Sequence, residues 1–397
     1  MTMTWWNRPW FKDKDGIICD GSIRSGKTLS MSVGFIMWAM AAFDGHVFAI
    51  CGKTIESLRR NVITQLPVWL EGIVDITEKR SENKLIAKVN GKTNTFYLFG
   101  GRDESSYTLI QGITLSGVLF DEAALMPRSF VEQAMARCSV TGSKFWFNCN
   151  PEGPGHWFYQ NWVLQAKERN ILHLHFTMED NLSLAEAIRK RYEAMYTGVF
   201  YDRYIRGLWV VAEGLIYSCF NPKMHIVPSE ERAYDRYYVS CDYGTINAFS
   251  CGLWGRCNDK WYRIKEYYFD SRKENRQQTD AEYYERLVEL VGDRKIRAVI
   301  VDPSAASFIE TIRRAGRFRV EQASNAVLDG IRDVATQLQL GNLFICETCT
   351  DCIREFGLYR WDEKAKEDKP LKTDDHSMDD VRYFVHTVFT PPRFSFK

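Results

Sequence analysis

The sequence is poor in features that would assign it to a specialised class of protein. Among its 397 residues, no apolar run approaches the roughly 20 residues that a membrane-spanning helix needs. The opening stretch, MTMTWWNRPWFKDKDG, lacks the apolar core and small-residue cleavage site of a signal peptide. No internal repeat or low-complexity tract is visible. We therefore expect a cytosolic, globular protein without a membrane partner, long enough for two domains.

The sequence also has little net charge. Its formal charge of +1 argues against nucleic-acid binding over the whole surface, so any contact with nucleic acid must be local. Basic runs at 270–278 and 311–319 are candidates for a local contact. Most runs of this kind are simply solvated faces, so they decide nothing alone.

The sequence has one cluster of cysteines, and this cluster lacks a ligand that a closed metal site would need. The stretch CETCTDC spaces Cys346, Cys349 and Cys352 three apart, but no cysteine or histidine follows nearby as a fourth ligand. The flanking LFI and IREFGLY favour a strand running into a helix with buried thiols. We interpret the cluster as structural and the 11 cysteines as reduced.

One complete phosphate-binding motif is present near the N-terminus. Residues 21–28, GSIRSGKT, satisfy G-x-x-x-x-G-K-[ST] in full. In such a loop the glycines let backbone N–H groups surround phosphates, Lys27 reaches the outer phosphates and Thr28 ligates Mg²⁺. The β-branched GIICD precedes the loop and a long apolar stretch follows it, as strand and helix should. The pattern predicts a nucleotide site formed by Gly21, Ser22, Ile23, Arg24, Ser25, Gly26, Lys27 and Thr28.

Elements in the first half alternate between strand-like and helix-like patterns. We expect a strand at 46–52, a helix starting after Thr54 as N-cap, and two strands around Asn90 and Gly91. Further strands end in GVLFDEA and FWFNCNP, with a helix near 128–138 between them. Strands separated by helices predict an α/β fold with a mostly parallel sheet covered on both faces.

The second half shows a different element order. Three strand-like runs, YYVSCDYG, NAFSCGLWG and KWYRIKEYYFD, come first, and helices and strands then alternate up to a last helix at 376–389. This is the order of a ribonuclease-H-like nuclease. An irregular stretch at 215–233 marks the boundary. We therefore predict a nucleotide-binding domain over 1–214, with a helical linker region from about 181, a connection over 215–233 and a nuclease domain over 234–397.

Acidic and amide side chains follow two strands of the first half. Asp121, at the end of GVLFDEA, is placed to hold Mg²⁺ through water, and Glu122 beside it can polarise the attacking water. That pair favours a hydrolase over a nucleotide-dependent switch. Asn148 and Asn150 follow the next strand, where an amide could sense the γ-phosphate, although such amides are often turn formers.

Two arginines are candidates for stabilising charge in the transition state. Arg24 lies inside the loop and could act in cis, whereas Arg102, in FGGRDES, could act on a neighbouring subunit.

Carboxylates of the second half stand at two strand ends and one helix start. Asp242 ends YYVSCDYG, Asp302 ends AVIVDPS, and the cluster TDDHSMDD opens the last helix. A sheet gathers ligands for two hard cations in this way. Two such cations about 4 Å apart activate water and stabilise the leaving oxygen in phosphodiester cleavage.

Together these motifs resemble the large terminase subunit of tailed phages and prophages, the DNA-packaging motor. The resemblance spans nearly the whole chain and includes GSIRSGKT, GVLFDEA, NCNPEGPGHWF, YIRGLWVVAEGLIY, CDYG, VDPSAASF and DDHSMDDVRY. Singly these strings are moderate signals, and in this order they are highly specific. No clear glutamine stands just upstream of Gly21 for recognising adenine, which departs from the family pattern.

The resemblance implies a P-loop ATPase domain of the RecA-like (ASCE) type and a ribonuclease-H-like nuclease domain. It assigns ATP hydrolysis, with Mg²⁺, to Lys27, Thr28, Asp121, Glu122 and Asn150. It assigns two divalent cations, Mg²⁺ or Mn²⁺, to Asp242, Asp302 and Asp379, with His376 beside them.

The resemblance also implies partners. They are double-stranded viral DNA, a procapsid portal on which the subunits form a homo-oligomeric ring, and a small terminase subunit that selects the DNA. The protein would act in the bacterial cytoplasm and transiently at the portal, and would be absent from the mature virion. Two alternatives stay open: a host-type repair or recombination ATPase-nuclease, and an ATP-driven DNA clamp whose C-terminal half is a catalytically dead docking module.

Two arguments disagree on which acid of the last helix binds metal. At about 100° per residue, Asp380 lies roughly 90° from the centre of the apolar stripe and Asp379 nearly opposite it, which favours Asp380. The family register, aligned through His376, favours Asp379. We expect Asp379 to be the ligand, because helical phase is least reliable in the first turn.

Overall fold

The computed structural model describes residues 2–244, 247–365 and 367–389. These residues form two compact units, one made of the chain up to Arg189 with Tyr201–Val211, the other of Lys190–Phe200 and the chain from Ala212 onward. The chain passes between the units within helix α5 (Glu186–Met195), within helix α6 (Gly198–Tyr204) and again after Val211. Within the described ranges, no helix combines the length and apolarity that crossing a membrane requires.

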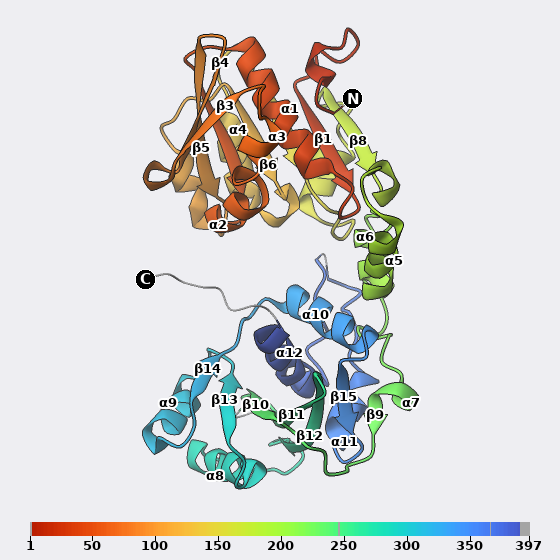
Figure 1. The fold of residues 1–397 in the computed structure, drawn as a ribbon. Helices are drawn as coiled ribbons and strands as arrows, with labels where there is room; N and C mark the ends of the chain where they lie inside the picture. The colour runs from red at the N-terminus through yellow and green to blue at the C-terminus, as the bar shows by residue number, and fades with distance from the viewer. Residues whose placement is uncertain (1, 245–246, 366, 390–397) are drawn as a thin grey trace. The chain divides into compact units, whose positions relative to one another are not determined.

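The first unit is built on an eight-stranded sheet (Figure 1). In spatial order its strands are β3 (Asp75–Lys79), β4 (Lys84–Val89), β5 (Lys92–Gly100), β2 (Val47–Gly52), β6 (Gly117–Asp121), β7 (Lys144–Asn148), β1 (Gly16–Gly21) and β8 (Ile171–Phe176). Each pairing from β5 to β8 is parallel, and only the pairings of β4 with β3 and β5 are antiparallel. The predicted mostly parallel sheet is confirmed. Strand β7 lies between β1 and β6. The phosphate loop after β1 and the acids at the end of β6 therefore lie on either side of the strand that ends in Asn148.

Helices cover both faces of this sheet, because successive side chains of a strand point to opposite sides. Ile17 of β1 packs in a core with α1 (Lys27–Ala42), and Ile18 packs in a second core with α4 (Arg128–Ala136). The tryptophan-rich N-terminus contributes to the first of these cores. Trp5 is fully buried, with its ring centroid 5.3 Å from that of Trp146.

The helix expected after Thr54 is interrupted. Thr54 is the N-cap of α2 (Ile55–Leu58), as predicted, and it forms a capping box with Ser57. A π-helical turn, η2 (Arg59–Ile63), then breaks the regular pattern, and α3 (Leu66–Trp69) restarts with Pro67 in its first turn. Proline suits a helix start because its missing N–H has no partner there, which explains why one predicted helix is two short ones.

The second unit contains a seven-stranded sheet (Figure 1). In spatial order its strands are β14 (Val320–Gln322), β13 (Ile296–Val301), β10 (Arg236–Asp242), β11 (Phe249–Cys257), β12 (Lys260–Phe269), β15 (Leu343–Cys346) and β9 (Ile226–Val227). Strands β10, β11 and β12 are antiparallel, and β13 pairs in parallel with β10. Its helices are α7 (Pro222–His225), α8 (Asp280–Val291), α9 (Ala306–Ala315), α10 (Val327–Gln339), α11 (Thr350–Phe356) and α12 (His376–Phe389). This is the ribonuclease-H-like order expected from the sequence.

Helix α12 lies on one face of this sheet, and α8 and α9 cover the other. Cys241 of β10 packs in the core with α8 and α9, whereas its neighbour Ser240 contacts Asp380 of α12. Trp254 of β11 stacks on Phe384 of α12 with centroids 4.1 Å apart. Because α10 packs on α12 as well, nearly the whole first half of α12 is buried.

Candidate functional sites

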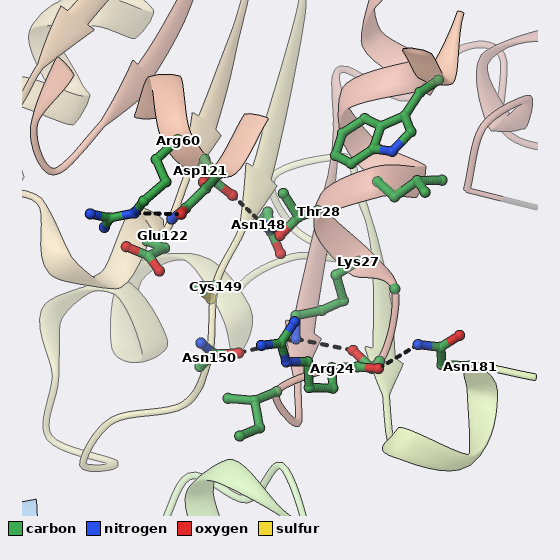
Figure 2. Close-up of a pocket in the computed structure, with 16 residues that line it drawn as sticks. Arg24, Lys27, Thr28, Arg60, Asp121, Glu122, Asn148, Cys149, Asn150 and Asn181 are labelled. Carbon is green, nitrogen blue, oxygen red and sulfur yellow. Dashed lines mark hydrogen bonds between the residues drawn. The ribbon is translucent and has the colours of Figure 1, made fainter. Parts of the chain in front are cut away.

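The phosphate-loop motif forms one wall of a cavity of about 620 Å³ in the first unit (Figure 2). The loop joins β1 to α1, and two glycines take backbone conformations that other residues avoid: Gly21 with φ 128° and Gly26 with φ 85°. A Cβ on Gly21 would lie 1.9 Å from the carbonyl oxygen of Phe176, so the loop requires glycine there. Residues 23–28 of the loop line the cavity with Asp121, Glu122 and Asn150. The structure thus brings the N-terminal site residues together.

Lys27 is held inside the loop by oxygen atoms. Its Nζ donates to the carbonyl oxygens of Gly21 (3.1 Å) and Ser22 (2.6 Å), to Ser25 Oγ (3.2 Å) and to Asn150 Oδ1 (3.1 Å). Burial lowers the pKa of Lys27 to about 8, with nearby acidic groups acting against that shift. The Asn150 contact joins the loop to the segment after β7, a link that the sequence pattern alone indicated only weakly.

Asn148 connects the two residues expected to hold Mg²⁺. Its Nδ2 donates to Thr28 Oγ1 (3.0 Å) and to Asp121 Oδ1 (2.6 Å). Burial raises the pKa of Asp121 to about 7, and the adjacent Glu122 carboxylate acts in the same direction. The buried Oδ1 of Asn148 has no hydrogen-bond partner among the described residues. Several oxygen atoms therefore lie near the Asp121 carboxylate, whose ionisation is unfavourable without a counter-charge. Such a group of oxygen ligands is suited to a hard divalent cation.

Arg24 and Glu122 both take left-handed backbone conformations at this cavity. Arg24 has φ 57°, and its carbonyl oxygen accepts a hydrogen bond from Asn181 Nδ2 at 2.7 Å. Glu122 has φ 61°. Such backbone positions in non-glycine residues are uncommon and concentrate at functional sites. Arg102, the candidate trans arginine, is exposed and does not line the cavity.

A cluster of polar side chains stabilises β1, the strand that leads into the phosphate loop. The buried carboxylate of Asp20 accepts hydrogen bonds from His173 Nε2 (2.9 Å), His175 Nδ1 (3.0 Å) and Trp209 Nε1 (2.6 Å). Burial acts to raise the pKa of Asp20, but the two histidine hydrogen bonds hold it below its usual range. A Cβ on Gly207 would lie 2.8 Å from the Ser22 nitrogen, so the segment carrying Trp209 packs directly on the loop.

Four residues that no motif identified also line the first cavity: Arg60, Asn61, Trp69 and Asn181. They come from η2, from α3 and from the loop after β8, which are far from the motifs in sequence. A π-helical turn within a predicted helix is often functional, but it has no sequence signature.

Six acidic or histidine residues of the second half line a cavity of about 510 Å³ in the second unit, together with Lys372. They are Asp242, Asp270, Asp374, Asp375, His376 and Asp379. Burial raises the pKa of Asp242 to about 7, opposed by a hydrogen bond from His376 Nδ1 to Asp242 Oδ2 at 2.9 Å. Asp375 was not singled out from the sequence, although it lies inside the acidic cluster at the start of the last helix.

Asp302 does not line this cavity. Its Oδ2 accepts a hydrogen bond from the Tyr383 hydroxyl (2.6 Å), and its Oδ1 accepts one from the Ser304 amide (2.7 Å). Burial acts to raise the pKa of Asp302, but these hydrogen bonds lower it overall. Within the described part of the chain, no three His, Cys, Asp or Glu residues are grouped closely enough to hold a metal ion.

Asp379 and Asp380 occupy different environments. Asp379 faces the cavity, and its Oδ1 accepts hydrogen bonds from Arg382 Nε (3.1 Å) and Nη2 (3.0 Å). Asp380 is fully buried, and its Oδ2 accepts hydrogen bonds from Arg263 Nη2 (2.7 Å) and Ser250 Oγ (2.8 Å). The helical-phase argument correctly placed Asp380 nearer the sheet. Its carboxylate, however, is paired there with Arg263. The carboxylates that line the cavity are the kind of oxygen ligand that Mg²⁺ and Mn²⁺ prefer.

Fold and cavities together define a class of protein: a P-loop nucleotide-binding unit joined to a ribonuclease-H-like unit. The sequence matches the family described as "Terminase large subunit, T4likevirus-type, N-terminal" over residues 18–224. The chain therefore belongs to the terminase large-subunit family.

Individual relatives agree with this assignment. The large terminase of a thermophilic bacteriophage is 55% identical, with 98% of this chain and 97% of that chain covered at a TM-score of 0.93. The same phage protein in complex with ADP is 53% identical, with 98% of both chains covered at a TM-score of 0.91. The large terminase subunit of Escherichia phage T5 is 23% identical over 295 residues, which span 68% of this chain but only 65% of that protein.

Proposed function

We propose that this chain is the motor and nuclease subunit of a phage DNA-packaging machine. It would hydrolyse ATP, drive double-stranded DNA into an empty procapsid and cut concatemeric viral DNA. The observation that carries the proposal is that one chain of the terminase family has both a phosphate-loop cavity and a separate carboxylate-lined cavity. Residues 1–214 would supply the motor, 215–233 the connection and 234–397 the nuclease.

In the first cavity the loop amides and Lys27 would bind the ATP phosphates, and Thr28 and Asp121 would hold Mg²⁺. The bound cation neutralises phosphate charge. Glu122 would orient the attacking water, with Arg24 stabilising developing charge in cis and Arg102 a candidate from a neighbouring subunit. To reach a phosphate, Lys27 would exchange its contact with Asn150 Oδ1 for a phosphate oxygen. Asn150 would therefore respond to the presence of nucleotide. The complexes of the thermophilic phage terminase with ADP and ATP-γ-S support nucleotide binding at this fold.

In the second cavity Asp242 and Asp379, with Asp302 nearby, would hold two Mg²⁺ or Mn²⁺ ions beside His376. Such cations supply an activated water and stabilise the leaving oxygen of a phosphodiester. The Asp242 carboxyl group, with its pKa of about 7, would exchange its proton for a cation on loading.

Family membership favours packaging over the repair or recombination alternative. The proposed partners are double-stranded viral DNA, a portal that carries a homo-oligomeric ring of these subunits, and a small terminase subunit. The proposed location is the host cytoplasm and the procapsid portal, with the subunit absent from the mature virion.

The clamp alternative has one observation in its favour: the described residues contain no preassembled group of three metal-binding side chains. Under that alternative the second unit would dock DNA or protein without cutting. The two proposals differ in whether the purified full chain nicks plasmid DNA with Mg²⁺ or Mn²⁺ and stops on chelation.

The experiment that tests the packaging proposal is ATP-dependent uptake of DNA into matching empty capsids, scored by nuclease protection of the DNA. Wild-type chain should protect DNA only when ATP is present, and Lys27→Ala should protect none. Protection that needs no ATP, or none under any condition despite ATP hydrolysis, would contradict the motor role.

A further inference from the structure

Each carboxylate of the proposed nuclease site is already paired with a protein group. Asp242 contacts His376, Asp302 contacts Tyr383, and Asp379 contacts Arg382. The fourth partner is Lys372, whose Nζ lies 3.3 Å from Asp375 Oδ2 and 3.5 Å from Asp379 Oδ2. An ammonium group therefore stands between two cavity carboxylates, where it shields their repulsion and competes with any divalent cation for them.

Lys372 differs from the other partners in exposure. The Arg382 side chain is only 3% exposed, whereas the Lys372 side chain is 70% exposed and the two carboxylates it contacts are 6% and 10% exposed. Lys372 stands in the short loop that precedes α12, two residues after the bridge formed by Pro370. An exposed lysine on a flexible stem gives up an ion pair at little cost, whereas a buried arginine does not.

We propose that Lys372 is a resident counter-cation of the nuclease cavity, which competes with divalent metal for Asp375 and Asp379 and so sets the metal concentration at which the site loads. Lys372 is a positioning residue in this scheme, because it acts on the ligands and not on DNA. The inference rests on the proposed nuclease function of the same cavity.

The test is Mn²⁺ binding to the nucleotide-free full chain, measured by isothermal titration calorimetry at low ionic strength. The part of the signal that Asp242→Asn removes defines the nuclease cavity. Lys372→Met should lower the Kd of that part by about five-fold, the scale of one solvent-screened charge pair at this distance. Lys372→Arg should stay within about two-fold of wild type, because the competing charge is kept.

Two matched lysines control for a general effect of removing positive charge. Lys273 pairs at 3.6 Å with Asp270, which lines the same cavity but is not among the proposed metal ligands. Lys369 lies just before the same loop and pairs at 3.8 Å with Asp362, which does not line the cavity. Lys273→Met and Lys369→Met should each change the Kd by less than about two-fold. Circular dichroism melts verify that each variant is folded, and Lys372→Gln replaces Lys372→Met if the latter does not fold.

The outcomes separate this inference from the proposed function. If Lys372→Met binds Mn²⁺ no more tightly than Lys273→Met, or more weakly than wild type, Lys372 is not a competing cation, even if metal-dependent cutting is intact. If Asp242→Asn changes neither Mn²⁺ binding nor DNA cleavage, the nuclease assignment fails and this inference fails with it. Binding of Mn²⁺ by Lys372→Met alone, without binding by wild type, would support the inference in its strongest form.

Discussion

The two cavities differ in how their polar groups are arranged before any ligand arrives. In the first, Asn148 joins Thr28 to Asp121, and the oxygens that hold Lys27 belong to the same loop or to Asn150. In the second, Asp242, Asp302 and Asp379 each contact a different protein group. One wall of the first cavity is a single continuous loop, residues 23–28, whereas the second is lined by side chains from β10, from the segment after β12 and from the start of α12. A wall made by one loop can be preorganised locally, and a site on three elements must also satisfy the packing of each.

The largest expected effect is a complete separation of the two activities. Lys27→Ala should reduce ATP hydrolysis by about 10³-fold or more, because it removes the cation nearest the transferred phosphate. Asp242→Asn should remove DNA cutting to a similar extent while ATP hydrolysis persists. Phosphate release and plasmid nicking by the two purified variants measure both. Loss of both activities in either variant would show that the cavities are not independent.

A second prediction separates binding from turnover within the first cavity. Glu122→Gln should bind a fluorescent ATP analogue as wild type does but hydrolyse ATP about 10²–10⁴-fold more slowly, since an amide cannot accept the water proton. Equilibrium binding and steady-state hydrolysis are the measurements. Hydrolysis at the wild-type rate would show that another group orients the water.

A third prediction contrasts the neighbouring acids of α12. Asp379→Asn should lower metal-dependent cleavage by about 10²-fold or more, because it removes a proposed ligand but leaves Arg382 at the cavity edge. Asp380→Asn should instead destabilise the fold by about 3 kcal/mol, because it leaves the buried Arg263 with only Glu266, 3.6 Å away, as a counter-charge.

Thermal melts and cleavage assays on both variants decide between these roles. Cleavage by Asp380→Asn should return to near the wild-type rate at temperatures where the variant is folded. A well-folded Asp380→Asn that neither cuts DNA nor binds Mn²⁺ would transfer the ligand role to Asp380.

The smallest predicted effect concerns pH. With its pKa raised to about 7, the Asp242 carboxyl is protonated at pH 6 and must lose that proton to bind metal. The Kd for Mn²⁺ at the second cavity should therefore be about ten-fold weaker at pH 6 than at pH 8. Between about pH 4 and 7 the folded state keeps a proton on Asp242 that the unfolded state has lost. The contribution of Asp242 to the stability of the metal-free fold therefore falls as pH rises through this range. Mn²⁺ titrations at both pH values check the first effect; a pH-independent Kd would contradict the raised pKa.

Motifs that are contiguous in the chain were interpretable from the sequence. The loop at 21–28, the strand ending at Asp121 and the helix at 376–389 all occur in the structure as expected, and the element order predicted both folds. Local backbone preferences and hydrophobic periodicity act over a few residues, so one sequence is enough to reveal them. The resemblance to terminases then linked motifs that lie far apart.

Tertiary packing decided what periodicity could not. Helix α12 is buried by the sheet on one side and by α10 on another, so its apolar stripe does not indicate which acid faces the cavity. Asp380 points inward to Arg263, which fits against the sheet because Gly252 has no side chain: a Cβ there would lie 2.0 Å from Arg263 Nη1. Arg60 and Trp69 reach the first cavity because η2 and α3 pack against α1, and Asn181 reaches it because its side chain donates a hydrogen bond to the Arg24 carbonyl oxygen. By itself the sequence determined the motifs, the element order and hence the family. Only the folded chain decided that Asp242 shares a cavity with His376 and that Asp380 is paired with Arg263, because those pairings depend on contacts between residues more than a hundred positions apart.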